Sequence, residues 1–332
     1  MNQPPIVLHA LWRARGTYFW SLFRKDIRFR AYYEPLHEAL VEKPVDRWQL
    51  EFKTGAPRVL RHPSLDAHYA SEYPLSTDRG LPHFKPTMSY GNFFLRAEDE
   101  DQDLEAYLRW LIDYAALFGQ RSFFKITRGG LRAGFIRRVL GGAHIYVNRP
   151  PSELHASYRS FGSSSYFTAT LTYLLIRYAD RPLCGATIEC MRAFGAFDDA
   201  GLRDRFSGGL TIAYPISNAL TDSQSAILTA SFWLAYLLEG LAVADVTIDT
   251  ERLGADEKYR SAIGAVLVPS LGRDAFADYR ATPCRDDFTA YAQPLRRILA
   301  ADKRLGSLAA EAPARALDSL GDASRRLLDA VL

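Results

Sequence analysis

Two short stretches of the sequence carry arginines and hydroxyl side chains at positions where they could bind a small anion. The first, "LHALWRARGTYFW", has four residues of interest between an apolar run and a helix-like segment: Arg13, Arg15, Gly16 and Thr17. A strand, a basic loop and a helix start would bring guanidinium groups, a hydroxyl and backbone N–H groups to one point, where the helix dipole also favours an anion. The stretch matches neither G-x-x-x-x-G-K-[ST] nor G-x-G-x-x-G, so an isolated basic turn is the alternative interpretation.

The second stretch is "AHIYVNRPPSELHASYRSF". Arg149 follows an apolar, strand-like run, and the two prolines after it suit a turn and the first position of a helix. Ser157 comes eight residues after Arg149, about 7 Å along that helix, which is near enough for both side chains to bind one phosphate. On spacing alone, a solvated arginine and a packing serine explain the pattern equally well.

Together the two stretches resemble the sulfotransferases that use 3′-phosphoadenosine-5′-phosphosulfate (PAPS). Members of that family have an N-terminal strand–loop–helix, typically R/K-S-G-T/S-T/S, for the 5′-phosphosulfate. They also have a later strand that ends in R-x-P, with a serine eight residues after the arginine, for the 3′-phosphate. The stretch "NRPPSELHASY" is similar to this second motif and has its spacing. The resemblance therefore implies that Arg149 and Ser157 bind the 3′-phosphate and that the loop at 13–17 binds the 5′-phosphosulfate.

The resemblance extends over roughly residues 5–265. The segment "YYEPLHE" looks like the "EPL" of carbohydrate sulfotransferases, and "VADVTIDTERL" is similar to the family's late "YEDL" strand. The chain departs from the family in two places. Its first loop reads "RARGTY", so that either Arg13 or Arg15 could meet the 5′-phosphosulfate. At 125–128 it has "KITR" where cytosolic members have K-T-H, whose histidine is the base.

The general base must therefore be a residue outside this stretch. Lys125 could donate to the transferring group, and Glu34 is the first candidate for the general base, because it lies at a predicted strand end beside the anion loop. We expect partial burial to raise the pKa of Glu34 towards neutral pH. His37 is the second candidate. The alternative interpretations are a surface glutamate that caps a helix and a histidine in the core or on the surface.

Composition limits the class of protein. The chain has 332 residues, of which 48% are apolar, and its 41 basic and 38 acidic residues give a net charge of +3. This balance argues against nucleic acid as a partner. The cysteines, Cys184, Cys190 and Cys284, match no zinc spacing, so we predict no metal and a reducing, intracellular setting. The start "PPIVLHALW" has no pattern of a signal peptide. These features predict a cytoplasmic protein and are compatible with a bacterial source.

Strand-like and helix-like segments alternate along the chain. The strands predicted with most support are 5–10, 122–127 and 143–148, and the alternation predicts a mostly parallel sheet that is covered by helices on both faces. We expect a single α/β domain over residues 1–332, with the P-loop-like three-layer fold of the sulfotransferases. A loop-rich insertion at about 41–95 would form a lid or bind the acceptor, and residues 166–332 would be mainly helical.

The apolar segment 226–246 is nearly long enough to span a membrane. Because Thr229, Ser231 and Glu239 interrupt it, we predict a buried helix of a soluble core and no membrane span.

The predicted partners are the PAPS donor and an acceptor with a hydroxyl group. The resemblance of "EPL" implies a glycan, and exposed aromatic residues of the insertion could stack on sugar faces: Tyr69, Tyr73, Phe84 and Tyr90. Peptidyl tyrosine, a lipid or a small alcohol are alternative acceptors. Two other functions stay open, a nucleotide-dependent kinase of related architecture and a non-catalytic, sulfotransferase-like binding protein. The sequence makes no prediction of the oligomeric state.

Overall fold

The fold is taken from a computed structural model. It describes residues 3–42, 68–74, 80–160, 166–197, 210–271, 276, 279–280, 287–312 and 317–332. Much of the predicted insertion at 41–95 lies outside the described residues. Within its described part, the backbone forms a short π-helix, η2 (Thr87–Gly91).

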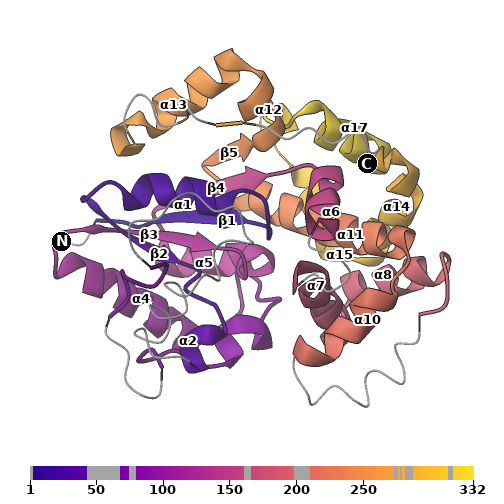
Figure 1. Cartoon of the computed structure of the whole chain (residues 1–332), viewed down its shortest axis with the longest axis horizontal. Helices are drawn as coiled ribbons and strands as arrows, with labels where there is room; N and C mark the ends of the chain where they lie inside the picture. Colours follow the sequence, from indigo (N-terminus) through magenta and orange to yellow (C-terminus); the bar gives the residue numbers. More distant parts are fainter. Residues whose placement is uncertain are drawn as a thin grey trace.

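The centre of the molecule is a five-stranded sheet in which all neighbouring strands are parallel (Figure 1). Its strands follow the order β2-β3-β1-β4-β5. In chain order they are β1 (Ile6–Ala10), β2 (Phe29–Tyr33), β3 (Arg121–Ile126), β4 (Ala143–Asn148) and β5 (Val246–Asp249). The strands predicted at 5–10, 122–127 and 143–148 are confirmed. They read as continuous apolar runs because a parallel sheet is buried on both faces.

The last strand covers only part of the segment "VADVTIDTERL", which resembles a late strand of the family. β5 ends at Asp249, and the helix α12 (Thr250–Ala255) begins at the next residue. The Asp249 side chain accepts hydrogen bonds from the backbone N–H groups of Glu251 and Arg252, at 3.0 and 3.1 Å. An aspartate in this position satisfies N–H groups that have no partner within the helix, which explains why the strand stops here.

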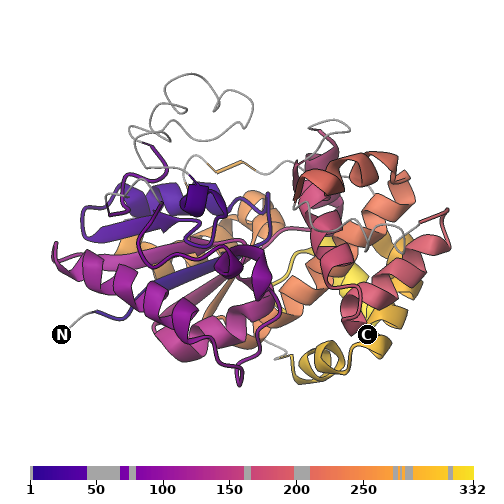
Figure 2. The same ribbon diagram turned by 90° about the horizontal axis from the view of Figure 1, so that it is seen from below.

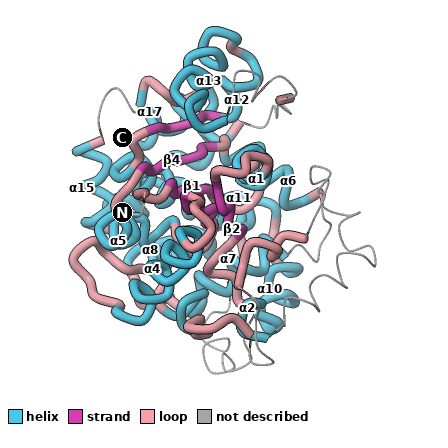
Figure 3. Tube along the Cα trace, turned by 90° about the vertical axis from the view of Figure 1, so that its left-hand side faces the viewer, coloured by secondary structure: helices cyan, strands magenta, loops and turns pink. Residues whose placement is uncertain are grey.

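Helices cover both faces of the sheet, as predicted (Figure 3). Successive residues of β1 point to opposite faces: Leu8 packs in one hydrophobic cluster with residues of α1 (Gly16–Arg24), whereas Val7 packs in the other. This second cluster contains the buried faces of α4 (Gln102–Ala116) and α5 (Ala133–Leu140). The sheet is therefore the middle one of three layers.

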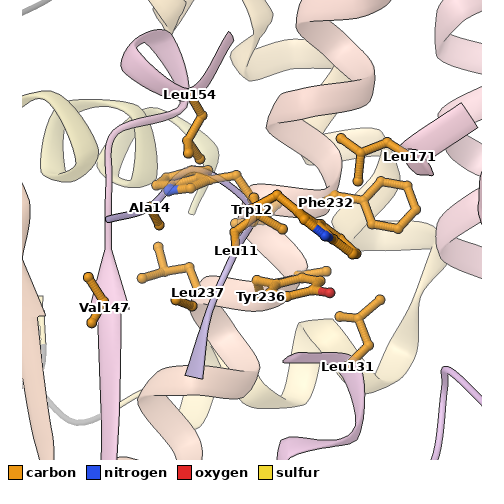
Figure 4. Packing of buried hydrophobic residues seen from close by; sticks show 14 of the residues in the cluster. Leu11, Trp12, Ala14, Leu131, Val147, Leu154, Leu171, Phe232, Tyr236 and Leu237 are labelled. Atoms are coloured by element: carbon orange, nitrogen blue, oxygen red, sulfur yellow. The ribbon is translucent and has the colours of Figure 1, made fainter. Parts of the chain in front are cut away.

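The second half of the chain is largely helical and lies mostly to one side of the sheet (Figure 2). Its longest helix is α11 (Asp222–Val243), which by length and composition could cross a membrane, but 94% of its most apolar window is buried inside the protein. Figure 4 shows Phe232, Tyr236 and Leu237 of α11 among residues of other elements. The predicted core helix at 226–246 is thus confirmed.

The other helices of this half are α6 (Pro151–Arg159), α7 (Tyr166–Arg177), α8 (Pro182–Arg192), α10 (Ala213–Ala219), α13 (Glu257–Leu271), α14 (Ala292–Ala301), α15 (Lys303–Glu311) and α17 (Asp322–Val331).

The strand order places a ligand-binding position at the edge of the sheet where the strands end. From β1 the chain continues to β2 on one side, and from β4 it continues to β5 on the other, although β1 and β4 are neighbours. In open parallel sheets, ligands bind outside the carboxyl ends of strands at such a divergence. The loop after β1 and the turn after β4 both lie at this edge.

Candidate anion-binding site

The loop between β1 and α1 has an unusual backbone. Arg13 and Arg15 have φ angles of 66° and 65°, in the left-handed region that non-glycine residues rarely adopt. Arg15 is also the N-cap of α1, and its side chain makes no capping hydrogen bond. The first N–H groups of a helix need partners from outside the helix. The start of α1 thus follows directly after two arginines, whose backbone conformation is typical of ligand-binding loops.

Gly16 lets this helix start lie directly against β3. A Cβ atom on Gly16 would be 2.7 Å from Cε of Lys125 and 3.2 Å from Cβ of Ala10. Any larger residue would displace the Lys125 side chain, which is buried. The glycine therefore brings the amide end of α1 and the Lys125 ammonium group into one small region.

The arginine and serine predicted from the second stretch lie beside this loop. Nη1 of Arg149 donates to the carbonyl oxygen of Arg13 at 2.7 Å, and Nε of Arg13 donates to Oγ of Ser157 at 3.2 Å. The structure therefore brings Arg13, Arg149 and Ser157 into one cluster. The Arg15 guanidinium lies over an aromatic ring, with Cζ 5.4 Å from the centre of the Tyr279 ring.

Glu153 belongs to the same cluster and was not predicted. Its Oε2 accepts a hydrogen bond from Nε of Arg149 at 2.8 Å, and both side chains are at most one-tenth exposed. The two residues are four positions apart, a spacing that places side chains next to each other on a helix. That spacing in "RPPSE" was the signal that could have revealed the pair.

The positive charges of the cluster lie close enough together to affect the pKa of Arg13. Burial lowers the pKa of Arg13, and the neighbouring Arg149 and Arg15 lower it further, whereas Tyr33 and Tyr158 raise it. Arginine nevertheless remains protonated in proteins. The loop therefore holds neighbouring guanidinium groups of which Glu153 neutralises one.

Glu34 lies at the end of β2 in a dense set of hydrogen bonds. Its carboxylate is paired with Lys125, and it accepts from the Thr127 N–H at 3.1 Å and from the Thr127 hydroxyl at 2.5 Å. Nη1 of Arg128 lies 3.4 Å from Oε2 of Glu34. The residue is 3% exposed and has a φ angle of 50°. Glu34 is therefore a buried partner of two cations.

The predicted rise in the pKa of Glu34 is wrong. Burial does raise it, but the attraction of Lys125 and Arg128 and the hydrogen bonds outweigh burial, so that the pKa lies below its ordinary value. The sequence placed Lys125 in the same site as Glu34 but did not indicate a direct ion pair, because the pairing of β2 with β3 brings Lys125 and Arg128 beside Glu34 from more than 90 positions away.

His37 lies near the surface of the same region. Burial and the charge of Arg128 lower its pKa to about 4, so the ring is neutral at pH 7. Nδ1 of His37 accepts the N–H of Ala39 at 3.1 Å, which leaves the ring proton on Nε2. The same Nδ1 is 3.4 Å from Oε2 of Glu38.

Glu38 was not among the predicted site residues. Its carboxylate accepts from Nη2 of Arg128 at 2.7 Å and from the Tyr166 hydroxyl at 3.0 Å. Burial raises its pKa, but Arg128 and His37 lower it more, to about 2. Glu38 is therefore ionised beside the His37 ring.

The aromatic residues predicted to stack on a sugar do not form an exposed surface. Tyr73, Phe84 and Tyr90 are buried, because they pack in the hydrophobic clusters on the two faces of the sheet. Tyr69 is partly buried and packs on the rings of Trp20 and Tyr33, at centroid distances of 5.6 and 4.6 Å. The prediction of exposed stacking aromatics at these positions is therefore wrong.

Among the described residues, no group of three or more His, Cys, Asp or Glu side chains could hold a metal ion. Cys184 and Cys190 are buried thiols, and Cys284 lies outside the described part of the chain.

Comparison of the chain with protein-family models, with curated proteins and with solved structures finds no match. A functional interpretation has to rest on the residues of the site.

Proposed function

We propose that this protein transfers a sulfuryl group from PAPS to an acceptor hydroxyl, and that its sheet and first loop form a P-loop-like fold. The observation that carries the proposal is the cluster of Arg13, Arg149 and Ser157 beside the start of α1. Arginines from two loops that are 136 positions apart in the sequence meet there, at the edge of the sheet where parallel folds bind ligands. The proposed acceptor is a glycan, on the resemblance of "YYEPLHE" alone.

The two phosphate groups of the donor would occupy neighbouring positions. The 5′-phosphosulfate would bind at the start of α1, with Arg13, the Thr17 hydroxyl and the backbone N–H groups as donors. The 3′-phosphate would bind Arg149 and Ser157. Nε of Arg149 is held by Glu153 and its Nη1 by a carbonyl oxygen, so the guanidinium plane is fixed and Nη2 remains for the phosphate.

Transfer requires that a new S–O bond forms to the acceptor while the bond between sulfur and the bridging phosphate oxygen breaks. The electron pair of the broken bond stays on the leaving 5′-phosphate, where Arg13 and the helix start would stabilise the added charge. Lys125 would donate to the transferring group. Its ammonium group is fixed by Glu34, which gives Glu34 a positioning role in the proposal.

The acceptor proton would go to His37. Its side chain is 27% exposed, compared with 4% for Glu34. If Nδ1 of His37 exchanges its bond to the Ala39 N–H for one to the Glu38 carboxylate, the ring proton moves to Nδ1 and Nε2 becomes a base. The ionised Glu38 would then stabilise the imidazolium that forms.

Thermal unfolding in the presence of 3′-phosphoadenosine 5′-phosphate (PAP), of ATP and of buffer alone tests the proposal. A ligand at 100 times its Kd stabilises a protein by about 2.7 kcal/mol. We expect PAP to raise the melting temperature and ATP to have little effect. A rise with ATP alone would favour a kinase, and no rise with either would contradict the proposal.

A further inference from the structure

A tyrosine hydroxyl lies at the start of α1, on the side away from Arg149. Tyr33 is the last residue of β2, and its hydroxyl is 3.1 Å from Oγ1 of Thr17 in the first turn of α1. The site therefore contains a second hydroxyl that the sequence motifs do not include.

The Tyr33 ring is held on several sides. The ring of Trp20 meets it edge-on at a centroid distance of 4.9 Å, and the ring of Tyr69 lies 4.6 Å away. Nζ of Lys125 is 4.5 Å from the ring centre. The hydroxyl of Tyr73 donates to the backbone carbonyl of Tyr33 at 2.8 Å. These contacts fix the direction of the Tyr33 hydroxyl before any ligand binds, and such preorganisation makes a hydrogen-bond donor effective in catalysis.

The sheet places Tyr33 on the opposite side of β1 from Arg149. β4, which ends just before Arg149, is next to β1 on one side, whereas β3 and then β2 follow on the other. A donor with its 3′-phosphate at Arg149 and its 5′-phosphate at the start of α1 would thus direct its sulfuryl group towards Tyr33 and Lys125. His37 follows only four positions after Tyr33.

We propose that the Tyr33 hydroxyl donates a hydrogen bond to a non-bridging oxygen of the sulfuryl group, as a further catalytic residue. This inference rests on the proposed function. Tyr33 keeps its proton throughout: the S–O bond to the phosphate breaks, the S–O bond to the acceptor forms, and the acceptor proton goes to the base. The Thr17 hydroxyl is hydrogen-bonded to Tyr33 in the structure. In the complex it would turn to the oxygen that bridges sulfur and phosphate.

The variant Tyr33→Phe tests the proposal without an acceptor. Calorimetry compares the affinity for PAPS, which has the sulfuryl group, with the affinity for PAP, which lacks it. Because a hydrogen bond to a charged group is lost only in the PAPS complex, we expect PAPS to bind about tenfold more weakly and PAP to change by less than about twofold. The matched control is Tyr32→Phe, which also removes one tyrosine hydroxyl from β2, here one that donates to the backbone carbonyl of Leu111 in α4 at 2.7 Å, and which should change neither affinity by more than about twofold.

An equal change in both affinities, or none in either, would overturn the role of Tyr33. If Tyr33→Phe does not fold, Tyr33→Leu keeps an apolar side chain between Trp20 and Tyr69 and must show the same selective loss. Different results would rule out the proposed function and the role of Tyr33. If the unmodified protein binds neither PAPS nor PAP, the proposed function is wrong, whereas normal PAPS binding that does not depend on Tyr33 removes only this inference.

Discussion

At the scale of single residues, Glu34 shows how an environment decides the role of a side chain. A carboxylate at a strand end beside a basic loop suggested a base whose pKa is raised by burial. Burial is present, but Lys125 and Arg128 are buried with it, and the pKa falls. Glu34, Lys125 and Arg128 form a buried ion cluster in which Arg128 is also paired with the partly exposed Glu38, and removing one buried partner is costly.

Replacement of Glu34 and of His37 should therefore have different effects. Glu34→Gln removes the charge partner of Lys125 and leaves Arg128 paired with Glu38 alone, and we expect it to lower the free energy of unfolding by about 3–5 kcal/mol. His37→Asn should leave stability almost unchanged, since the side chain is partly exposed, but should reduce turnover by about 10²–10⁴ with normal PAP binding. Chemical denaturation gives the first quantity, and transfer from radiolabelled PAPS to a glycan panel gives the second.

The opposite pattern of effects would assign the role of general base to Glu34. A stable Glu34→Gln protein that binds PAP but has lost turnover, together with a fully active His37→Asn protein, would contradict the assignment of both residues.

The predictability of the site also differs between residues. Arg149 and Ser157 could be found from the sequence, because they lie on one strand–turn–helix segment whose local geometry fixes their separation. Tyr33, Glu34 and Glu38 have their important partners in other segments of the chain. Such contacts follow from the strand order, which a local pattern does not specify.

At the scale of elements, the apolar runs sufficed to predict β1, β3 and β4. The end of β5 was not predicted, because Asp249 is both the last residue of the strand and the N-cap of the next helix. The neighbouring strands β1 and β4 also contain a buried polar pair that no pattern indicated. Nε2 of His9 lies 2.9 Å from Nδ1 of His144, and the two rings are stacked.

This histidine pair should make the sheet sensitive to acid. Burial lowers the pKa of His9 well below its ordinary value and that of His144 to about 4. The unfolded chain therefore takes up protons at a higher pH than the folded protein does. Stability contributed by the pair is complete above about pH 6.5 and is lost as the pH falls towards 4, by at most about 1.4 kcal/mol per pH unit for each histidine.

Denaturant unfolding at pH 7.5 and pH 5 measures the effect. Other groups titrate in the same window: Glu239 has a pKa raised by burial to about 7 and contributes stability in the opposite direction, greatest at low pH. The informative quantity is thus the difference between the unmodified protein and a His9→Phe/His144→Phe variant, which should lose less stability on acidification. Equal losses in the two proteins would show that the pair does not titrate on unfolding.

At the scale of the whole molecule, the C-terminal helix is joined to the strand that leads to the candidate anion-binding site. Asn148, the last residue of β4, donates to Oγ of Ser324 in α17 at 2.8 Å and to Oδ2 of Asp249 at 2.7 Å. Its Oδ1 accepts from Nε1 of Trp233 in α11 at 3.0 Å. The buried amide of Asn148, the residue before Arg149, thus connects the sheet, the core helix α11 and the C-terminal helix α17.

Loss of this connection should weaken the molecule and its donor site together. Ser324→Ala removes one of the two hydrogen-bond acceptors of the Asn148 Nδ2 group. We expect it to lower the free energy of unfolding by about 1 kcal/mol. PAP affinity should fall by a few-fold at most, since Asp249 still holds the amide. Ser307→Ala, a replacement of the same type at an exposed position of α15, is the control. A Ser324→Ala protein as stable as the control would show that the bond contributes nothing.

We propose that Arg149 and its cluster recognise a 3′-phosphate next to a 5′-phosphate held by α1. Calorimetric titration with PAP and with adenosine 5′-phosphate, which lacks the 3′-phosphate, tests it most directly. We expect PAP to bind at least about tenfold more tightly than adenosine 5′-phosphate, because a charge-assisted contact is worth about 1.5–3 kcal/mol. Arg149→Ala should remove most of this preference. The control variant Arg159→Ala, on the same helix as Ser157, should retain it. Equal affinity of the unmodified protein for the two nucleotides, or no binding of either, would contradict the account.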